Sequence, residues 1–304
     1  MKSIHETVTE EYENERIDKY ITVLLDDLSR SYIQKIIKDE KVEVNHKKVK
    51  ANYKVKTDDV VSFEIPDAIE PEITAQDIPL EVLYEDRDVL VVNKPKGMVV
   101  HPAAGHYTDT LVNAVMYHCK GNLSGINGIM RPGIVHRIDM NTTGSIIVCK
   151  NDQAHNAIAE QLKEHSIDRR YRAIVYGVIK EEEGCIDKPI GRHPMDRKKM
   201  SIVAKNGKNA VTHYRVLKRF KKYTYIECKL ETGRTHQIRV HMASIGHPLL
   251  GDDVYTSQKC PYKLTGQTLH AMTLGFQHPR TKEYVEVIAP LPEYFVHLLN
   301  TLEE

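Results

Sequence analysis

The sequence predicts an α+β protein in which a small α/β N-terminal unit precedes a larger domain with a mixed, mainly antiparallel sheet and flanking helices. Three observations support this prediction. Strand-like alternation dominates after residue 80, strands and helices do not alternate regularly, and an acidic stretch with prolines separates two differently patterned parts. We therefore expect two domains, residues 1–75 including the linker and residues 76–304.

The first unit is predicted to contain two helices and a hairpin. Residues 16–25 and 30–38 have the apolar spacing of helices, and Ser29 can cap the second one. Residues 42–45 and 47–49 alternate as strands around a turn at Asn45 and His46, and residues 60–63 form another strand.

This helix–helix–hairpin order, with Ser-Arg-Ser at residues 29–31, resembles the S4 RNA-binding domain. The resemblance implies that basic residues of the second helix and the hairpin contact RNA phosphates, namely Arg30, Lys35, Lys38 and Lys48. The family usually has glycine at three turns where this chain has Glu40, His46 and Asp58. Because Glu and His tolerate positive φ less well than glycine, the geometry of these turns is open at this point.

The second domain is predicted to begin with a strand at 80–85, followed by strand, turn and strand over 89–102. Helices are expected at 110–118, at 153–164 with Asp152 as the cap, and at 294–302. Further strands are expected at 146–149, 171–178, 211–217 and 223–230, and the β-branched run before Asp139 also has strand character. Helices therefore lie scattered among a majority of strands.

Composition excludes several classes of protein. The chain has 304 residues, 41% of them hydrophobic and 28% charged, as in ordinary globular proteins. No apolar stretch is long enough to span a membrane, and the N-terminus does not have the pattern of a secretion signal. The five cysteines are widely spaced and form no Cys-x-x-Cys pair. We expect a cytoplasmic protein without membrane association.

The near-zero net charge hides a segregated distribution. The net charge is +1, yet residues 192–222 hold eleven Lys or Arg against a single acid, Asp196. Residues 64–88 are acidic by contrast, with nine Asp or Glu against Arg87. A local positive field of this kind is typical of nucleic-acid binding, although a solvated charged surface gives the same pattern.

One carboxylate stands out for its setting. Asp139 lies between an apolar, β-branched run and a Thr-Thr-Gly turn that leads into another apolar run. Because burying an unpaired charge costs several kcal/mol, Asp139 needs a partner. Arg239, a hundred residues on, is the natural counter-ion, since its fork can hold a carboxylate bidentately. Arg234 is a second candidate for that role. If residues 238–241 form a strand, Arg239 and His241 share one face.

Three segments together resemble the RNA pseudouridine synthases of the large-ribosomal-subunit (RluA/RluD) type, and the resemblance covers nearly the whole chain. They are Asn-Lys-Pro-Lys-Gly-Met-Val-Val-His-Pro at 93–102, His-Arg-Ile-Asp at 136–139 and Thr-His-Gln-Ile-Arg-Val-His at 235–241. The resemblance implies isomerisation of uridine to pseudouridine in RNA, without metal or redox cofactor. It implies that Asp139 is the catalytic nucleophile, by the base or the ribose route, and that Arg239 pairs with it.

The same resemblance assigns further residues to the substrate. Tyr171 would lie against the target base and could move a proton, and Leu269 would pack beneath that base. We interpret Arg137 as the wedge that fills the space left when the uridine leaves its stack, and His136 as a phosphate contact. The basic segment 192–222 would line the RNA path.

Rival functions have weaker support. His236 and His241 are five residues apart with no acid between them, which does not match the His-Glu-x-x-His zinc motif. The kinase His-Arg-Asp loop lacks its companion motifs. A non-enzymatic RNA-binding or ribosome-assembly protein would not require Asp139, Tyr171 and Arg239 together. We expect a monomer that acts on large-subunit rRNA, free or in the assembling subunit, with small-subunit rRNA and tRNA as alternatives.

Overall fold

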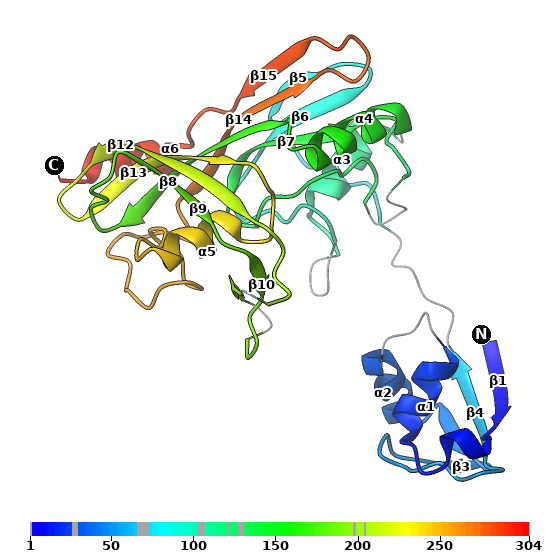
Figure 1. Ribbon diagram of the computed structural model, residues 1–304. Helices are drawn as coiled ribbons and strands as arrows, with labels where there is room; N and C mark the ends of the chain where they lie inside the picture. The colour runs from blue at the N-terminus through cyan, green and yellow to red at the C-terminus, as the bar shows by residue number, and fades with distance from the viewer. Residues whose placement is uncertain are drawn as a thin grey trace. The chain divides into compact units, whose positions relative to one another are not determined.

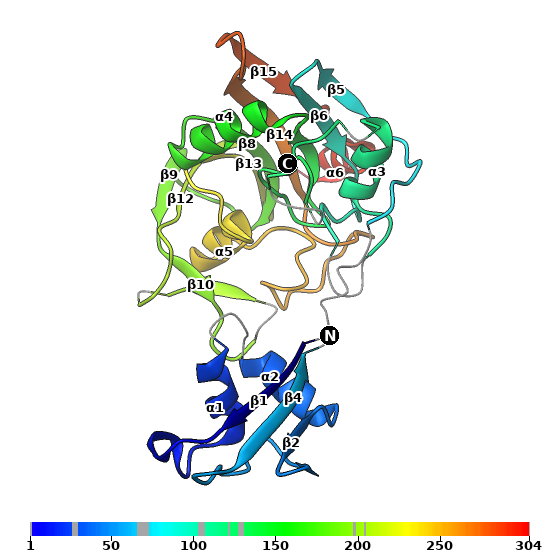
Figure 2. The same ribbon diagram turned by 90° about the vertical axis from the view of Figure 1, so that its right-hand side faces the viewer.

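The computed structural model describes residues 2–25, 30–65, 73–102, 107–120, 122–126, 131–196, 199–203 and 205–303. The chain divides into two compact units, Met1–Pro71 and Glu72–Glu304. Figures 1 and 2 show both units from two directions. No helix in the described part of the chain is long and apolar enough to cross a membrane.

The first unit packs two helices on a four-stranded sheet of order β1-β4-β2-β3. Its elements are β1 (Lys2–Thr7), the short 3₁₀ helix η1 (Glu10–Tyr12), α1 (Ile17–Leu24), α2 (Arg30–Lys38), β2 (Val42–Val44), β3 (Lys47–Lys48) and β4 (Val60–Ile65). Both helices, the β2–β3 hairpin and β4 are as predicted. Strand β1 was not predicted, because it precedes the patterned region and pairs with β4 at the far end of the unit. The proposed cap Ser29 lies outside the described residues.

The three turns without glycine keep the left-handed backbone that glycine would favour. Glu40, His46 and Asp58 have φ values of 58°, 63° and 70°, and Asn45 has 50°. Packing therefore overrides the local preference of these side chains, since the apolar sides of α1, α2 and the sheet form one buried cluster.

The second unit is built on a nine-stranded sheet, of order β5-β6-β7-β14-β8-β13-β12-β9 with β15 beside β14 (Figure 1). Neighbouring strands are antiparallel except β7 and β14, which are parallel over two residue pairs. The strands are β5 (Val82–Glu85), β6 (Val89–Lys94), β7 (Thr143–Cys149), β8 (Asp168–Tyr176), β9 (Glu183–Asp187), β12 (Val211–Arg219), β13 (Tyr223–Leu230), β14 (Leu269–Gln277) and β15 (Tyr284–Ile288). Strands β10 (Ile190–Arg192) and β11 (Met200–Ile202) form a separate pair.

Helices cover both faces of this sheet. On β6 and β7, alternate residues belong to two different buried clusters, one with α3 (Leu111–His118) and α5 (Gln237–Ser244) and the other with α4 (Asp152–Lys163). Helix α6 (Glu293–Thr301) packs on a third cluster with residues of β8 and β13. The α+β prediction and the mainly antiparallel sheet are confirmed.

Some predicted elements were wrong in detail. Residues 98–102 form no strand, because the carbonyls of Val99 and Val100 accept the first N–H groups of α3 instead. Asn151, not Asp152, caps α4 through a bond from Ala154 N–H. Strands β9, β10, β11, β14 and β15 were not predicted.

The run before Asp139 forms a loop beside β7 rather than a full strand. Ile134 makes a single bridge to Val148, the Gly133 carbonyl accepts from Cys149 N–H, and His136 accepts from Ile147 N–H. This loop is therefore hydrogen-bonded to the part of β7 that does not pair with β14. It delivers Asp139 to the point where β7 and β14 meet.

Candidate active site

A cavity of about 500 Å³ lies where the Asp139 loop, β8, the start of β14 and the N-terminus of α5 converge. A volume of this size is typical of small-ligand sites. The cavity is lined by six residues that the sequence proposed for catalysis or RNA binding: Arg137, His136, Asp139, Tyr171, Arg239 and Leu269. The other three, Arg30, Lys35 and Lys48, belong to the N-terminal unit.

A buried lysine fixes the loop that carries Asp139. Lys94, at the end of β6, donates from Nζ to the carbonyls of Pro95 and Met98 at 2.8 Å and of Met140 at 3.0 Å. Burial lowers the pKa of Lys94 to about 7, while the nearby charge of Asp139 opposes that shift. The residue after Asp139 is thus tied to the Asn-Lys-Pro segment, which explains why both motifs occur together.

Arg239 lies on helix α5, not on a strand, and it holds two carboxylates rather than one. Its Nη1 donates to Asp139 Oδ2 at 3.0 Å, while Nε and Nη2 bind Asp252 at 2.7 and 3.0 Å. The predicted ion pair with Asp139 is present, but the bidentate fork is directed at Asp252. Burial alone would lower the pKa of Arg239, yet the bonds and charges of Asp252 and Asp139 raise it, so the guanidinium stays charged.

The helical geometry also separates Arg239 from His241. His241 points elsewhere and bonds with the Thr212 hydroxyl and the Lys188 carbonyl. The prediction that these two side chains share a face was wrong. Arg234 donates from Nε to the carbonyl of Asn209 at 2.9 Å, whereas Asp139 accepts from Arg239, so Arg234 is not the counter-ion.

Asp252 was missed by the sequence analysis. It is 1% exposed and also accepts the backbone N–H groups of Val254 and Tyr255. The sequence does contain a pattern that could have identified Asp252. This acid follows an apolar pair and a glycine, Leu249-Leu250-Gly251, much as Asp139 follows an apolar run.

His236 and Tyr255 complete the surroundings of the ion pair. His236 Nε2 lies 3.8 Å from Asp139 Oδ1, and its Nδ1 is 2.7 Å from the Tyr255 hydroxyl. The Arg239 guanidinium lies 5.0 Å from the centre of the Tyr255 ring. Burial lowers the pKa of His236, although Asp139 opposes the shift. A neutral His236 leaves Arg239 as the cation that balances Asp139.

The geometry leaves one carboxylate oxygen of Asp139 open for chemistry. Oδ2 accepts from Arg239, whereas Oδ1 has no hydrogen bond within the part of the chain that the structure describes. A carboxylate that lines a cavity and has one oxygen held by a guanidinium can act as a nucleophile or a base.

Tyr171 and Leu269 supply the less polar wall. Tyr171 lies on β8 opposite Ala271, and Leu269 on β14 lies opposite Ala173, so both are placed by the same strand pair. They are 8% and 4% exposed. Burial raises the pKa of Tyr171, and the negative charge of Asp139 adds to that effect while Arg169 opposes it. The phenol is therefore neutral near pH 7.

Arg137 and His136 differ in what they can offer RNA. Arg137 is exposed, and its Nη1 lies 3.5 Å from His101 Nε2. His136 Nε2 accepts from Ile147 N–H at 3.0 Å, and burial, with a smaller effect of Arg169, lowers its pKa to about 3. A phosphate contact from His136 would therefore come from a neutral ring through Nδ1–H.

In the N-terminal unit, Arg30 is partly engaged. Its Nε and Nη2 bind Asp18 Oδ2 at 3.2 and 3.0 Å, and Asp18 is fully buried and also binds Arg16 and Gln34. These bonds lower the pKa of Asp18 to about 2, against burial, which would raise it. Lys48 pairs with Glu40 at the surface. The side chain of Lys35 lies outside the described ones.

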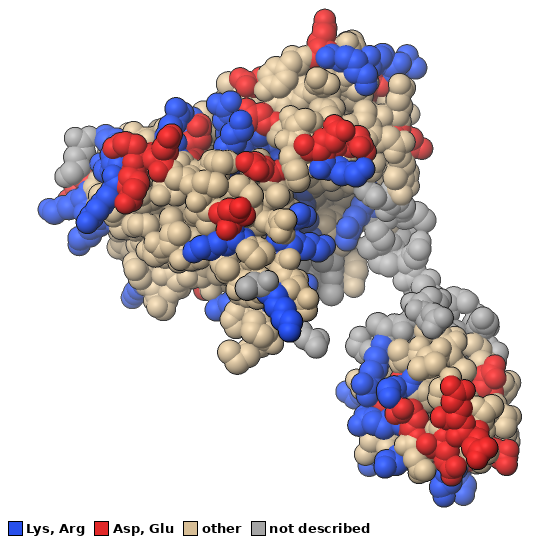
Figure 3. All heavy atoms as spheres, in the orientation of Figure 1, with Lys and Arg blue, Asp and Glu red and all other residues tan. Residues whose placement is uncertain are grey.

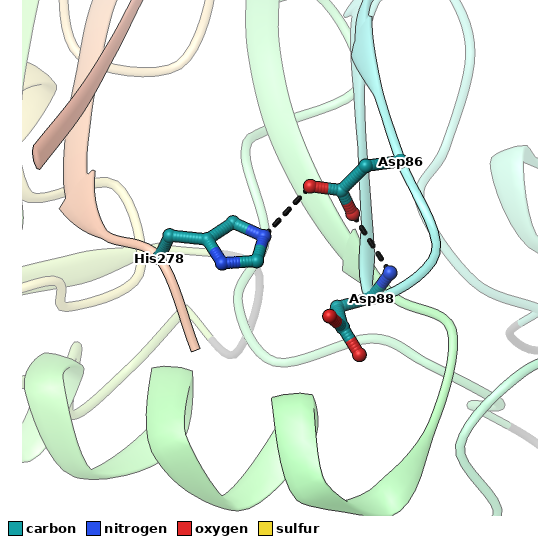
Figure 4. Close-up of side chains that lie close together, drawn as sticks. All are labelled: Asp86, Asp88 and His278. Carbon is teal, nitrogen blue, oxygen red and sulfur yellow. Dashed lines mark hydrogen bonds and ion pairs between the residues drawn. The ribbon is translucent and has the colours of Figure 1, made fainter. Parts of the chain in front are cut away.

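Among the described residues, one group has the composition of a metal site, Asp86, Asp88 and His278 (Figure 4). Asp86 already accepts from the His278 ring, the Tyr84 hydroxyl and two backbone N–H groups. Both oxygens of Asp88 bind the Arg280 guanidinium. We interpret the group as a hydrogen-bond network that ties the β5–β6 turn to the segment after β14.

Known proteins are similar to this chain over most of its length. Residues 88–244 match the family model described as RNA pseudouridylate synthase, and residues 15–61 match the S4 domain. The chain is 52% identical over 304 residues to an uncharacterized RNA pseudouridine synthase of Bacillus subtilis, covering 100% of this chain and 99% of that one. It is 48% identical over 297 residues to the ribosomal large subunit pseudouridine synthase D of Zymomonas mobilis, covering 94% and 93% of the two chains.

A solved structure is similar as well. Human RNA pseudouridylate synthase domain containing 1 matches with a TM-score of 0.58 and 25% identity, over 76% of this chain and 98% of that chain. Together these matches decide against a non-enzymatic RNA-binding protein. The chain belongs to the RNA pseudouridine synthases, a family of isomerases, and carries an S4 RNA-binding domain ahead of its catalytic unit.

Proposed function

We propose that this pseudouridine synthase modifies a defined uridine of large-subunit (23S-type) ribosomal RNA, with Asp139 as the nucleophile and the target base flipped into the cavity. The observation that carries the proposal is the open Oδ1 of Asp139, beside Arg239, in a cavity walled by Tyr171 and Leu269. Several relatives with 40–48% identity are named ribosomal large subunit pseudouridine synthase D, which supports the choice of RNA.

The reaction defines what each residue must do. The bond between uracil N1 and ribose C1′ breaks, the base turns, and a bond from C5 to C1′ forms while C5 loses its proton and N1 regains one. Addition of Asp139 to the base and attack at C1′ both use a carboxylate oxygen of Asp139, while Arg239 binds the other oxygen of the same carboxylate. Tyr171 would stack on the turning base and hold it in the cavity, and its neutral phenol can carry a proton.

Entry of the base requires extrusion from its stack. Arg137 is exposed at the rim of the cavity, and its planar guanidinium can occupy the vacated space. The S4 unit, with its linker within residues 1–75, would anchor the RNA, and residues 76–304 would perform catalysis. On the face of the N-terminal unit shown in Figure 3, basic side chains gather along one side and acidic ones along the other.

The basic segment 192–222 supports an RNA path only in part. Arg215 and Arg219 are paired with Glu227 and Glu182, whereas several lysines of this segment are exposed. We place the enzyme in the cytoplasm as a monomer. Its five cysteines are all free, which is usual for a reducing compartment.

The test is pseudouridine mapping by carbodiimide adduct and primer extension on unmodified rRNA. Asp139→Asn is expected to abolish product while RNA affinity stays within a few-fold, because the change keeps the shape and removes the nucleophile. Asp253→Asn, which alters an exposed acid near the same site, is the matched control and should modify RNA like wild type.

Substantial turnover by Asp139→Asn would remove the nucleophile assignment. Product on tRNA or small-subunit rRNA, and none on naked or assembled large-subunit rRNA, would overturn the choice of substrate.

A further inference from the structure

The cavity that contains Asp139 is far more basic than the ion pair requires. Among the described residues that line it, Asp139 is the one acid, whereas the cations are Arg137, Lys163, Arg169, Arg234 and Arg239. Arg239 is balanced by Asp139 and Asp252. The positive charge at the other lining residues therefore has no counterpart from the cavity wall.

Arg169 is the most unusual of these cations. It lies on β8 two residues before Tyr171, on the same face of the strand, and it is only 6% exposed. Its Nη2 donates to the Glu231 carbonyl at 3.0 Å, but its buried Nε has no hydrogen-bond partner. Across the described residues no carboxylate lies within ion-pair distance of it. Burying a guanidinium that has an unused donor and no counter-ion costs folding free energy unless a ligand supplies the missing acceptor and charge.

The surroundings keep Arg169 in place rather than neutralise it. A Cβ on Gly233 would come within 2.7 Å of Arg169 Nη1, so the loop before α5 approaches the guanidinium as closely as glycine allows. Burial lowers the pKa of Arg169, Tyr171 opposes that shift, and the like charge of Arg234 adds to it. Among the described residues, the side chain of Arg234 donates only to a backbone carbonyl, that of Asn209.

We infer that Arg169, with Arg234 beside it, binds a phosphodiester group of the RNA backbone next to the flipped uridine. The inference rests on the proposed function, because it assumes that the nucleotide enters this cavity. A phosphodiester is the anionic group nearest to any flipped base, and a guanidinium matches its geometry. A uracil carbonyl is the alternative partner, but a neutral acceptor would leave the buried charge unbalanced.

The first test measures binding without turnover. The affinity of the full chain for an unmodified large-subunit rRNA transcript is determined at several salt concentrations for wild type, Arg169→Met and Arg170→Met. Arg170 is the matched control, because it is the neighbouring arginine on the opposite face of β8 and pairs with Asp168. Loss of one phosphate contact should reduce the slope of log affinity against log salt by about 0.7–0.9 in Arg169→Met, and Arg170→Met should keep the wild-type slope.

The second test locates the phosphate. Once mapping has given the target uridine, a synthetic stem-loop containing it is made with the 5′ or the 3′ flanking phosphodiester replaced by a neutral methylphosphonate. One replacement should raise the wild-type KM roughly tenfold with little change in kcat. The same replacement should not raise the KM of Arg169→Met further, whereas the KM of Arg170→Met should rise as it does for wild type.

The outcomes separate this inference from the proposed function. Replacing a buried cation with an apolar side chain of similar shape is often tolerated, so Arg169→Met is expected to fold. If Arg169→Met does not fold, Arg169→Lys takes its place, because it keeps the charge but lacks the forked guanidinium. The methylphosphonate replacement should then raise the KM of Arg169→Lys less than it raises the KM of wild type. An unchanged salt slope, or equal methylphosphonate losses in wild type and the Arg169 variant, would overturn the inference. Absence of product with wild type would instead count against the proposed function. The salt slope would still test the role of Arg169, because it measures binding and does not depend on turnover.

Discussion

The shared guanidinium of Arg239 makes Asp252 a sensitive position outside the recognised motifs. Asp252→Asn removes the negative charge that accepts Arg239 Nε and Nη2 at 2.7 and 3.0 Å. The oxygen that remains can still accept the N–H groups of Val254 and Tyr255, but an amide NH₂ then faces one donor of Arg239. Arg239 is left with Asp139 as its carboxylate.

The magnitude follows from the burial of the pair. Asp252 is 1% exposed, and breaking a buried ion pair by removing one partner costs about 3–5 kcal/mol. For a unit of this size, roughly 4 kcal/mol corresponds to a fall in Tm of about 8–16 °C. Arg239 should also shift toward Asp139, and a misplacement of about 1 Å lowers the rate about 10²-fold.

The assay combines thermal unfolding with single-turnover pseudouridine formation at a temperature where the variant is folded. Asp253→Asn, at the neighbouring exposed acid, is the control and should leave both measurements unchanged. If Asp252→Asn unfolds and reacts like wild type, the bidentate pair does not position Arg239 and the reasoning is wrong.

Three further predictions concern other parts of the molecule. Asp18 has a folded pKa of about 2 against an ordinary 3.8, so its contribution to the stability of the N-terminal unit is present above pH 4 and is lost as pH falls toward 2. Asp18→Asn should weaken that pH dependence in hydrogen exchange of the full chain, and an unchanged dependence would assign it to another group. Gly144→Ala should lower Tm sharply, because the φ of Gly144 is 108° and a Cβ there would lie 2.2 Å from the Ala271 carbonyl oxygen. Gly125→Ala is the control and should leave Tm unchanged, because a Cβ at Gly125 would have no heavy atom within 4 Å. Arg137→Ala should reduce kcat/KM about 10–100-fold without changing Tm, because its exposed side chain would act only when the base is extruded; a large Tm change would show a structural role instead.

Sequence reasoning worked where one local signal dominated. Helix α2 was predicted with its observed bounds, because its apolar residues recur at helical spacing on one side. The pairing of Asp139 with Arg239 was also foreseen, since an acid between apolar runs requires a cation. Periodicity was enough for the helix, whereas the choice of Arg239 over Arg234 also needed the resemblance of residues 235–241 to the family motif.

The sequence-based prediction failed where complete burial of a helix removed its hydrophobic periodicity. In α5 every residue from Gln237 to Met242 is buried, so the helix has no polar face to give a 3.6-residue period. Ile238, Val240 and Met242 alternate with polar residues instead, and this pattern is typical of a strand. The strand assumption led to the wrong expectation that Arg239 and His241 share a face.

The short parallel contact between β7 and β14 has a consequence for how the protein is made. Thr143 and His270 meet there although they are 127 residues apart, and closing a loop of that length costs about 4 kcal/mol of chain entropy. Asp139 and Leu269 come together only when this contact forms. The cavity that contains Asp139 therefore cannot exist on a nascent chain until β14 has left the ribosome, whereas the N-terminal unit can fold long before that. Appearance of activity should thus mark the end of folding.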